Sequence, residues 1–376
     1  MLPQPPLWLV LIAFICALGP LVFFHELGHY LAARLFRIPA EAFSIGFGRE
    51  ILGWTDRQGT RWKVGWLPLG GYVRFVGDMS PASLPGPEEE IAPEDRERAF
   101  QFRPVWQRFL VVLAGPVANF LLAIMIFAAF FATVGAPRTE NVVAKIAPRS
   151  AAEQAGLRPG DRIVSVGDRD TPSFEDISEF VVLRPGEKTS VTIERSHKLI
   201  RFPITIGAVN ESDRFGQQFR VGRLGIYGDA RTYAKLPVAE LLPAATSYTY
   251  KLTRSMVEGL WQIVSGRRSA KDLGGPIKVA QYAGQGASLG LLPFVQLLAL
   301  FSINLGFINL LPVPVLDGGH LFFYAVEAVR RRPLSAKALD WAFRGGLALI
   351  LALLVFTTIN DLGSLGLWDR LQRLIG

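Results

Sequence analysis

The sequence has little of the two residue types that most often build metal sites. It contains one cysteine, Cys16, and four histidines among 376 residues. A single thiol can form neither an intramolecular disulfide nor a zinc site made of several thiolates. Any metal must therefore be held mainly by nitrogen and oxygen ligands.

Charged residues are also scarce. Only 19% of the residues are charged and 50% are hydrophobic, which excludes intrinsic disorder and argues against a wholly soluble globular protein. The formal net charge of +8 would suit nucleic acid or an anionic membrane surface. Because so much of the sequence is apolar, we expect the lipid bilayer as a partner and no nucleic acid.

Four apolar stretches predict membrane-spanning helices. A bilayer core about 30 Å thick needs about 20 mostly apolar residues in helical form. Such stretches lie at about 6–36, 107–136, 289–316 and 343–366. Pro312 and Pro314 lie near the end of the third stretch, so regular helix must stop before them. The predicted fold is a polytopic α-helical membrane protein with about four transmembrane helices, whose core is divided into residues 1–137 and 289–376.

A short basic loop between the third and fourth stretches predicts the orientation in the membrane. Its basic residues are Arg330, Arg331, Arg332, Lys337 and Arg344. Positively charged loops of this kind remain in the cytoplasm. Counting back along the chain, residues 37–108 are also cytoplasmic, and residues 138–288 lie on the opposite side.

The motif His25-Glu26-Leu27-Gly28-His29 directly follows the first apolar run. Histidines four residues apart lie on one face of a helix, so both imidazoles can reach one metal ion. The adjacent Glu26 can polarise a metal-bound water as a general base. Titratable groups at the edge of lipid are costly unless they serve a function. This cost favours a metal site over a helix end whose polar groups merely reach the interface.

A catalytic zinc ion usually has three protein ligands, so a third ligand is needed. His197 lies in a polar region and is expected on a solvent-exposed turn. The other candidates, Asp317 and His320, follow the broken third stretch. We favour Asp317, because a carboxylate at that depth needs a cation, and expect His320 to be a hydrogen-bonding residue of the next helix. The predicted cofactor is one Zn²⁺ per chain, held by His25, His29 and Asp317.

Together these motifs resemble those of the site-2 proteases, the intramembrane zinc metalloproteases. The resemblance rests on the motif at 25–29 and on Asn309, Pro312 and Asp317-Gly318, which match the family's Asn-x-x-Pro and Asp-Gly pattern. Residues 67–73 and 114–119 resemble two further family segments. The motifs keep the family's order over nearly the whole chain, and they are most similar to those of the bacterial regulator-of-sigma-E type.

The resemblance implies a function and a location. It implies an endopeptidase of the bacterial cytoplasmic (inner) membrane, with its active site toward the cytoplasm. Its substrates would be single-span membrane proteins already trimmed outside the membrane, such as anti-sigma factors, or leftover signal peptides. The role would be regulated intramembrane proteolysis, with Asn309 and Pro312 at the place where the family binds substrate.

Residues at about 60–77 predict a membrane-associated β-hairpin. Aromatic and β-branched residues flank Gly70-Gly71, where we expect the bend. An exposed edge strand at Gly70, Gly71, Tyr72 and Val73 could pair with an extended substrate segment. The alternative is a hairpin with a purely structural role.

Residues 138–228 predict an inserted, mainly-β domain. The segment 147–161 resembles the PDZ domains of bacterial proteases, and we expect this domain on the periplasmic side, where it could bind a peptide or restrict access. The regulator-of-sigma-E type has two such domains, and only one is visible here. Residues 229–288 read as an amphipathic helical linker.

Two questions stay open at the level of sequence. Asn119, in the second stretch, could be a structural hydrogen-bond bridge or could stabilise an oxyanion. The main alternative function is a catalytically inactive membrane PDZ scaffold with a structural zinc, although such a site would not require Glu26. A metal transporter is disfavoured because no second ligand set or inverted repeat is visible.

Overall fold

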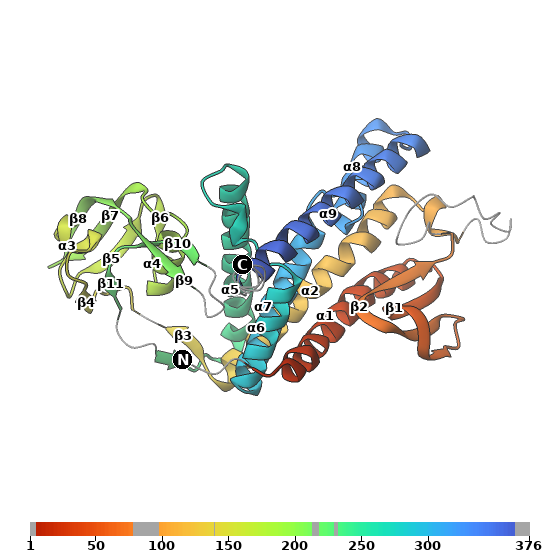
Figure 1. Cartoon of the computed structure of the whole chain (residues 1–376), viewed down its shortest axis with the longest axis horizontal. Helices are drawn as coiled ribbons and strands as arrows, with labels where there is room; N and C mark the ends of the chain where they lie inside the picture. Colours follow the sequence, from red (N-terminus) through yellow and green to blue (C-terminus); the bar gives the residue numbers. More distant parts are fainter. Residues whose placement is uncertain (1–4, 78–97, 139, 213–217, 229–231, 365–376) are drawn as a thin grey trace, which may run out of the picture. The chain divides into compact units, whose positions relative to one another are not determined.

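A computed structural model describes residues 5–77, 98–138, 140–212, 218–228 and 232–364 (Figure 1). The chain divides into two compact units. The first draws on the residues up to Phe127 and on Gly274–Asp361, and the second on Ala128–Leu273. The first unit contains the long apolar helices, and the second contains most of the short strands.

Among the described residues, four helices are long and apolar enough to cross a membrane, as the sequence predicts. They are α1 (Leu7–Leu35), α2 (Val105–Thr133), α7 (Leu291–Asn309) and α9 (Ala336–Ser364). The third helix is shorter than its apolar stretch. It ends at Asn309, before Pro312 and Pro314, because proline has no backbone N–H and clashes with the preceding turn. Helix α8 (Asp317–Arg330) then begins at Asp317, so the Asp-Gly motif opens a separate helix.

A two-stranded antiparallel sheet follows α1. Strand β1 (Ala40–Thr55) and strand β2 (Arg61–Phe75) are joined by a turn at 56–60. The Asp56 carboxylate accepts the backbone N–H groups of Gln58 (2.8 Å) and Thr60 (3.0 Å), which is how aspartate stabilises a tight turn. Residues 61–64 of β2 run parallel to residues 42–45 of β1 and residues 71–74 run antiparallel to them, so β2 reverses direction between residues 64 and 71, next to the bend expected at Gly70-Gly71.

Strand β2 pairs with β1 along two separate parts of its length. Residues 42–45 of β1 pair with 61–64 on one side and with 71–74 on the other. Residues 71–74 therefore form an outer edge, to which no further strand pairs among the described residues. The Asp56 carboxylate also accepts hydrogen bonds from Tyr30 on α1 (3.3 Å) and from Trp62 (3.0 Å), so the sheet is fixed against the metal-motif helix.

Burial and hydrogen bonding act in opposite directions on Asp56. Burial alone would raise the pKa of this carboxyl, but hydrogen bonds from Trp62, two backbone N–H groups and Tyr30 hold its pKa below the ordinary value. The charged form is therefore the one that anchors the sheet.

Helix α6 (Pro276–Ser288) packs on the first half of α1 through small residues. Ala13 and Ala17 of α1 and Ala283 of α6 are buried in one cluster, an arrangement that lets helix backbones approach closely. A short 3₁₀ turn, Phe100–Phe102, precedes α2 in the same unit.

The second unit is a small β-rich domain with two short helices. Its main sheet has the order β6-β5-β7-β8, formed by Arg169–Asp170, Arg162–Val166, Lys188–Arg195 and Lys198–Thr205. Three antiparallel pairs accompany it: β4 (Lys145–Ile146) with β11 (Ile226–Tyr227), β9 (Gly207–Ser212) with β10 (Gln218–Arg223), and β3 (Ala136–Arg138) with β12 (Thr232–Ala234). Its core contains Ile163, Ile177, Val191 and Ile193.

Helices α3 (Ala151–Ala155) and α4 (Phe174–Val182) of this domain begin at the caps that the sequence predicts. Ser150 accepts the N–H of Glu153 (3.3 Å), and Ser173 with Asp176 forms a complete capping box. His197 lies in the exposed turn between β7 and β8, as expected.

The described part of the predicted linker consists of strand β12, one long helix, a 3₁₀ turn and α6. Helix α5 (Val238–Val264) lies beside α4, where Lys251 pairs with Asp176 (2.8 Å) and Glu258 pairs with Arg184 (3.1 Å). The 3₁₀ turn Ala270–Asp272 follows α5. The range 229–288 is therefore helical from Val238 onward but also contains strand β12, and α5 forms part of the second unit.

Candidate metal centre

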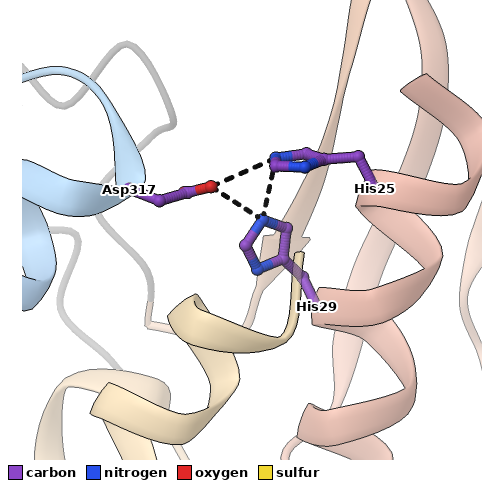
Figure 2. Close-up of side chains that lie close together, drawn as sticks. All are labelled: His25, His29 and Asp317. Carbon is purple, nitrogen blue, oxygen red and sulfur yellow. Dashed lines mark hydrogen bonds and ion pairs between the residues drawn. The ribbon is translucent and has the colours of Figure 1, made fainter. Parts of the chain in front are cut away.

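Three side chains from α1 and α8 converge on one point (Figure 2). The Nε2 atoms of His25 and His29 lie 3.3 Å apart. The Oδ2 atom of Asp317 lies 3.1 Å from the first and 3.5 Å from the second. The structure therefore brings together the three ligands that the sequence predicts, from segments almost 290 residues apart in the chain.

The surroundings of His29 fix which of its nitrogens faces that point. The Nδ1–H of His29 donates to the backbone carbonyl oxygen of Val111 on α2, at 2.9 Å. A carbonyl can only accept, so the proton sits on Nδ1 and the lone pair on Nε2. This outward hydrogen bond from the second nitrogen is typical of metal-binding histidines.

The three converging atoms suit a cation. His25 and His29 are less than 10% exposed, and Asp317 Oδ2 is buried without a hydrogen-bond donor among the described residues. A lone pair beside a carboxylate oxygen is repulsive unless a positive charge lies between them. Two imidazoles and one carboxylate are the ligand set of many catalytic zinc sites, so these residues fit a zinc ion.

The connection that leads to Asp317 has strained backbone. Val315, two residues before it, has a φ of +89°, a region that β-branched residues avoid. Such backbone persists only where the surroundings enforce it, and it is concentrated at functional sites.

Glu26 lies on a different face of α1, against the outer edge of β2. Its carboxylate accepts a hydrogen bond from the backbone N–H of Val73. The approach is close at Gly71, where a Cβ atom would lie 2.7 Å from a methyl of Val22 and 3.1 Å from Glu26 Cγ. Glycine at this position therefore lets the strand edge meet the acid beside the metal ligands.

The other predicted substrate residues are divided between two places. Asn309, the last residue of α7, has its amide nitrogen 3.5 Å from His25 Nε2, so it belongs to the centre. Pro312 lies in the connection to α8. Tyr72 instead stacks on Phe47 (6.2 Å between ring centroids), and Gly70 also packs against Phe47. Of the four strand residues, Gly71 and Val73 are those that the structure shows beside Glu26.

His320 takes no part in the convergence. It lies in the first turn of α8, with its ring 5.3 Å from that of Phe343. This placement agrees with the preference for Asp317 as the third ligand.

A family model described as Peptidase family M50 matches residues 13–353. The chain belongs to this family of metallopeptidases, which includes the site-2 proteases. M50 membership and the four apolar helices make the protein a multi-pass membrane metalloprotease. The inactive scaffold considered from sequence loses its support, because the family is one of enzymes.

Named relatives agree on the metal. The chain is 43% identical over 362 residues to "Putative zinc metalloprotease" of Agrobacterium fabrum, covering 94% of this chain and 96% of the relative. A protein of Rhizobium meliloti with the same description is 44% identical over 359 residues, at 94% and 96% coverage. "Metalloprotease MmpA" of Caulobacter vibrioides is 36% identical over 380 residues, at 94% and 95% coverage. Zinc is the cofactor of this M50 protease.

The supporting residues on α2 could not be assigned from sequence. Gly115 lies so close to the His29 ring that a Cβ atom there would overlap with Nε2. The Asn119 amide nitrogen lies 3.1 Å from His25 Nδ1. Val111, Gly115 and Asn119 are spaced by four residues, like the histidines that they contact, and this matched spacing is the signal that could have been used.

Proposed function

We propose that the chain is an endopeptidase that cleaves transmembrane segments of other membrane proteins, with zinc held by His25, His29 and Asp317. One observation carries the proposal: two of the three ligands lie within α1, a helix long and apolar enough to span a membrane. About 27 Å of helix precedes His25, so the centre would lie at membrane depth. A bound zinc ion supplies Lewis-acid polarisation of a carbonyl and activation of water near neutral pH.

In this proposal Glu26 moves the proton. It accepts a proton from the attacking water and then donates it to the amine of the departing peptide. The hydrogen bond from Val73 holds the carboxylate at the strand edge, so the acid and the backbone that would bind substrate are fixed to each other.

The outer edge of β2 would bind the substrate as an added strand. Residues 71–74 pair with β1 on one side and, within the described part of the chain, with no strand on the other, and Val73 directs its N–H toward Glu26. An unwound substrate segment could pair with this edge as an added strand. In that extended form the peptide bonds of the substrate are exposed, whereas in a helix they are not. Asn309, beside His25 Nε2, is placed to donate a hydrogen bond to the same backbone.

The substrate class and location follow from the family resemblance. We propose single-span proteins already trimmed outside the membrane, such as anti-sigma factors, as substrates in regulated intramembrane proteolysis. The enzyme would lie in the bacterial inner membrane, with the centre toward the cytoplasm and residues 138–228 on the periplasmic side. We also propose that this domain is a PDZ domain that binds or restricts substrates.

The test uses a single-span substrate in detergent, with wild type and Glu26→Gln, each with and without a zinc chelator. Glu26→Gln should keep one zinc per chain and lose about 10²- to 10⁴-fold in rate. Mass spectrometry of the products should place the cut inside the apolar span. A cut confined to the flanking soluble segment would instead indicate a membrane-anchored protease. Zinc binding without cleavage of any truncated span would contradict the proposed activity.

A further inference from the structure

One face of α2 contacts both histidines of the metal centre. Val111, Gly115 and Asn119 follow one another at intervals of four residues, slightly more than one helical turn. The carbonyl of Val111 accepts from His29, Gly115 packs on the His29 ring, and Asn119 lies beside His25. Helix α2 therefore determines how both rings are turned.

Asn119 is itself held firmly. It is fully buried, and its backbone carbonyl accepts a hydrogen bond from Ser302 Oγ on α7 at 2.8 Å. Its amide nitrogen lies 3.1 Å from His25 Nδ1, whereas its Oδ1 is buried without a hydrogen-bond partner among the described residues. A buried amide oxygen without a donor is rare in folded proteins.

The metal ligand set decides which way this amide must point. If the amide nitrogen donated to His25 Nδ1, the imidazole proton would sit on Nε2, which points at Asp317 and His29. A protonated Nε2 cannot bind a metal. A half-turn of the amide exchanges its nitrogen and oxygen in almost the same space. Oδ1 then accepts from Nδ1–H, and the Nε2 lone pair faces the metal position.

We infer that Asn119 is a positioning residue of the zinc site, whose side-chain oxygen accepts the Nδ1–H of His25. This inference rests on the ligand set of the proposed function. It gives both histidines the same support: a backbone oxygen of α2 holds His29, and a side-chain oxygen of α2 holds His25. Each ring presents Nε2 to the metal because its Nδ1–H already has an acceptor.

Two substitutions of Asn119 separate this role from a packing role. Asn119→Leu keeps the approximate size and removes the acceptor, and should weaken zinc binding about 10- to 100-fold. Asn119→Asp is acceptor-only, and should keep affinity within about threefold of wild type. If the amide acted as a donor to His25, the Asp variant would be weakened as much as the Leu variant.

Zinc affinity is measured on the full chain in detergent, by competition with a chromophoric chelator. The matched control is Thr133→Val, on the same helix, which removes an exposed hydroxyl that donates to the Ala129 and Phe130 carbonyls of its own helix and should leave affinity unchanged. Equal affinities of the Leu variant and wild type would overturn the inference, and so would equal weakening of the Leu and Asp variants.

A direct measurement avoids dependence on variant folding. With four histidines in the chain, nitrogen-15 NMR of histidine-labelled, zinc-loaded wild type can separate protonated from metal-bound nitrogens. Difference spectra from His197→Gln and His320→Gln samples identify the signals of those two residues, and the two remaining histidines, His25 and His29, should both show a protonated Nδ1. Because the Nδ1–H of His29 donates to the Val111 carbonyl, a bare Nδ1 in this remaining pair is assigned to His25. A bare Nδ1 on His25 would overturn the inference. Failure of wild type to bind zinc would instead count against the ligand set.

Discussion

Asp361 of α9 caps the start of α6, which lies 83 to 86 residues earlier in the chain. One of its carboxylate oxygens accepts the N–H of Gly275 and the other accepts the N–H of Lys278, both at 3.1 Å. Free N–H groups in the first turn of a helix are normally satisfied by a nearby side chain of the same segment. Here the cap comes from another helix, and Asp361 is almost completely buried.

Loss of this cap should loosen α6 locally. We expect Asp361→Ala to cost about 1–2 kcal/mol and to speed hydrogen exchange in peptides covering 275–281. Asp361→Asn retains one acceptor and should show a smaller effect. Unchanged exchange in the alanine variant would contradict a capping role.

Gly71 should be needed for catalysis and not for zinc binding. In Gly71→Ala the new methyl would lie 2.6 Å from Ser44 O and 3.1 Å from Glu26 Cγ, so the strand or the acid must shift. We expect at least a tenfold loss of cleavage, with one zinc per chain retained. Gly19→Ala, on α1 with no atom within 4 Å of its new methyl, is the matched control and should cleave normally. Full activity of Gly71→Ala would count against the close approach of strand and acid.

Gly115 should show the opposite pattern. A methyl at this position would overlap with the His29 ring, so Gly115→Ala should turn that ring away from the metal position. We expect zinc affinity to fall at least tenfold, measured by chelator competition beside Gly19→Ala. Retention of wild-type affinity would mean that α2 can move aside, and would weaken the view that it sets the ring orientation.

The β-rich domain should lose stability in acid through Asp161. Its carboxylate accepts two hydrogen bonds from Arg195 and one from the N–H of Arg158, each at 2.7 Å. Burial alone would raise the pKa of Asp161, but the Arg195 and Arg158 interactions hold its pKa below the ordinary value. A carboxyl with a lowered folded-state pKa stabilises the fold above its unfolded value, about 3.9, and this contribution is lost as pH falls through the folded value.

We therefore expect protection against hydrogen exchange in peptides 141–166 to be constant near neutral pH and to fall below about pH 4. Asp161→Asn should be less stable by about 2–3 kcal/mol at pH 7 and should lack most of that acid dependence. Asp168→Asn, which changes an exposed carboxylate of the same domain, should behave as wild type. An identical acid profile in the Asp161 and Asp168 variants would contradict the assignment.

Local patterns in the sequence predicted the spans and the metal ligands, because both depend on short-range rules. Apolar run length gives the helices, and the spacing of His25 and His29 places them on one helical face. Asp317 could be proposed because a carboxylate within apolar sequence needs a cation. These three residues meet in the structure as expected.

Contacts between distant segments were harder to predict. The sequence predicts the bend near Gly70-Gly71, where β2 does reverse direction so that its far end returns to β1, but it does not indicate the turn at Asp56 that joins β1 to β2. Asn119 was recognised as a buried amide, yet its partner His25 lies 94 residues away. Neither pairing has a local signature, because each depends on how α1, α2 and β2 pack together.

The paired strands β3 and β12 bring the two ends of the β-rich domain together. Arg138 and Thr232 are directly opposite each other in this ribbon, where facing Cα atoms lie about 5 Å apart. The chain thus enters and leaves the domain at adjacent positions. If the domain were removed, a short turn could join Arg138 directly to Thr232. Domains with adjoining ends are readily inserted into other chains, so the β-rich domain and the helices that hold the metal centre could have evolved separately before they were joined in one polypeptide.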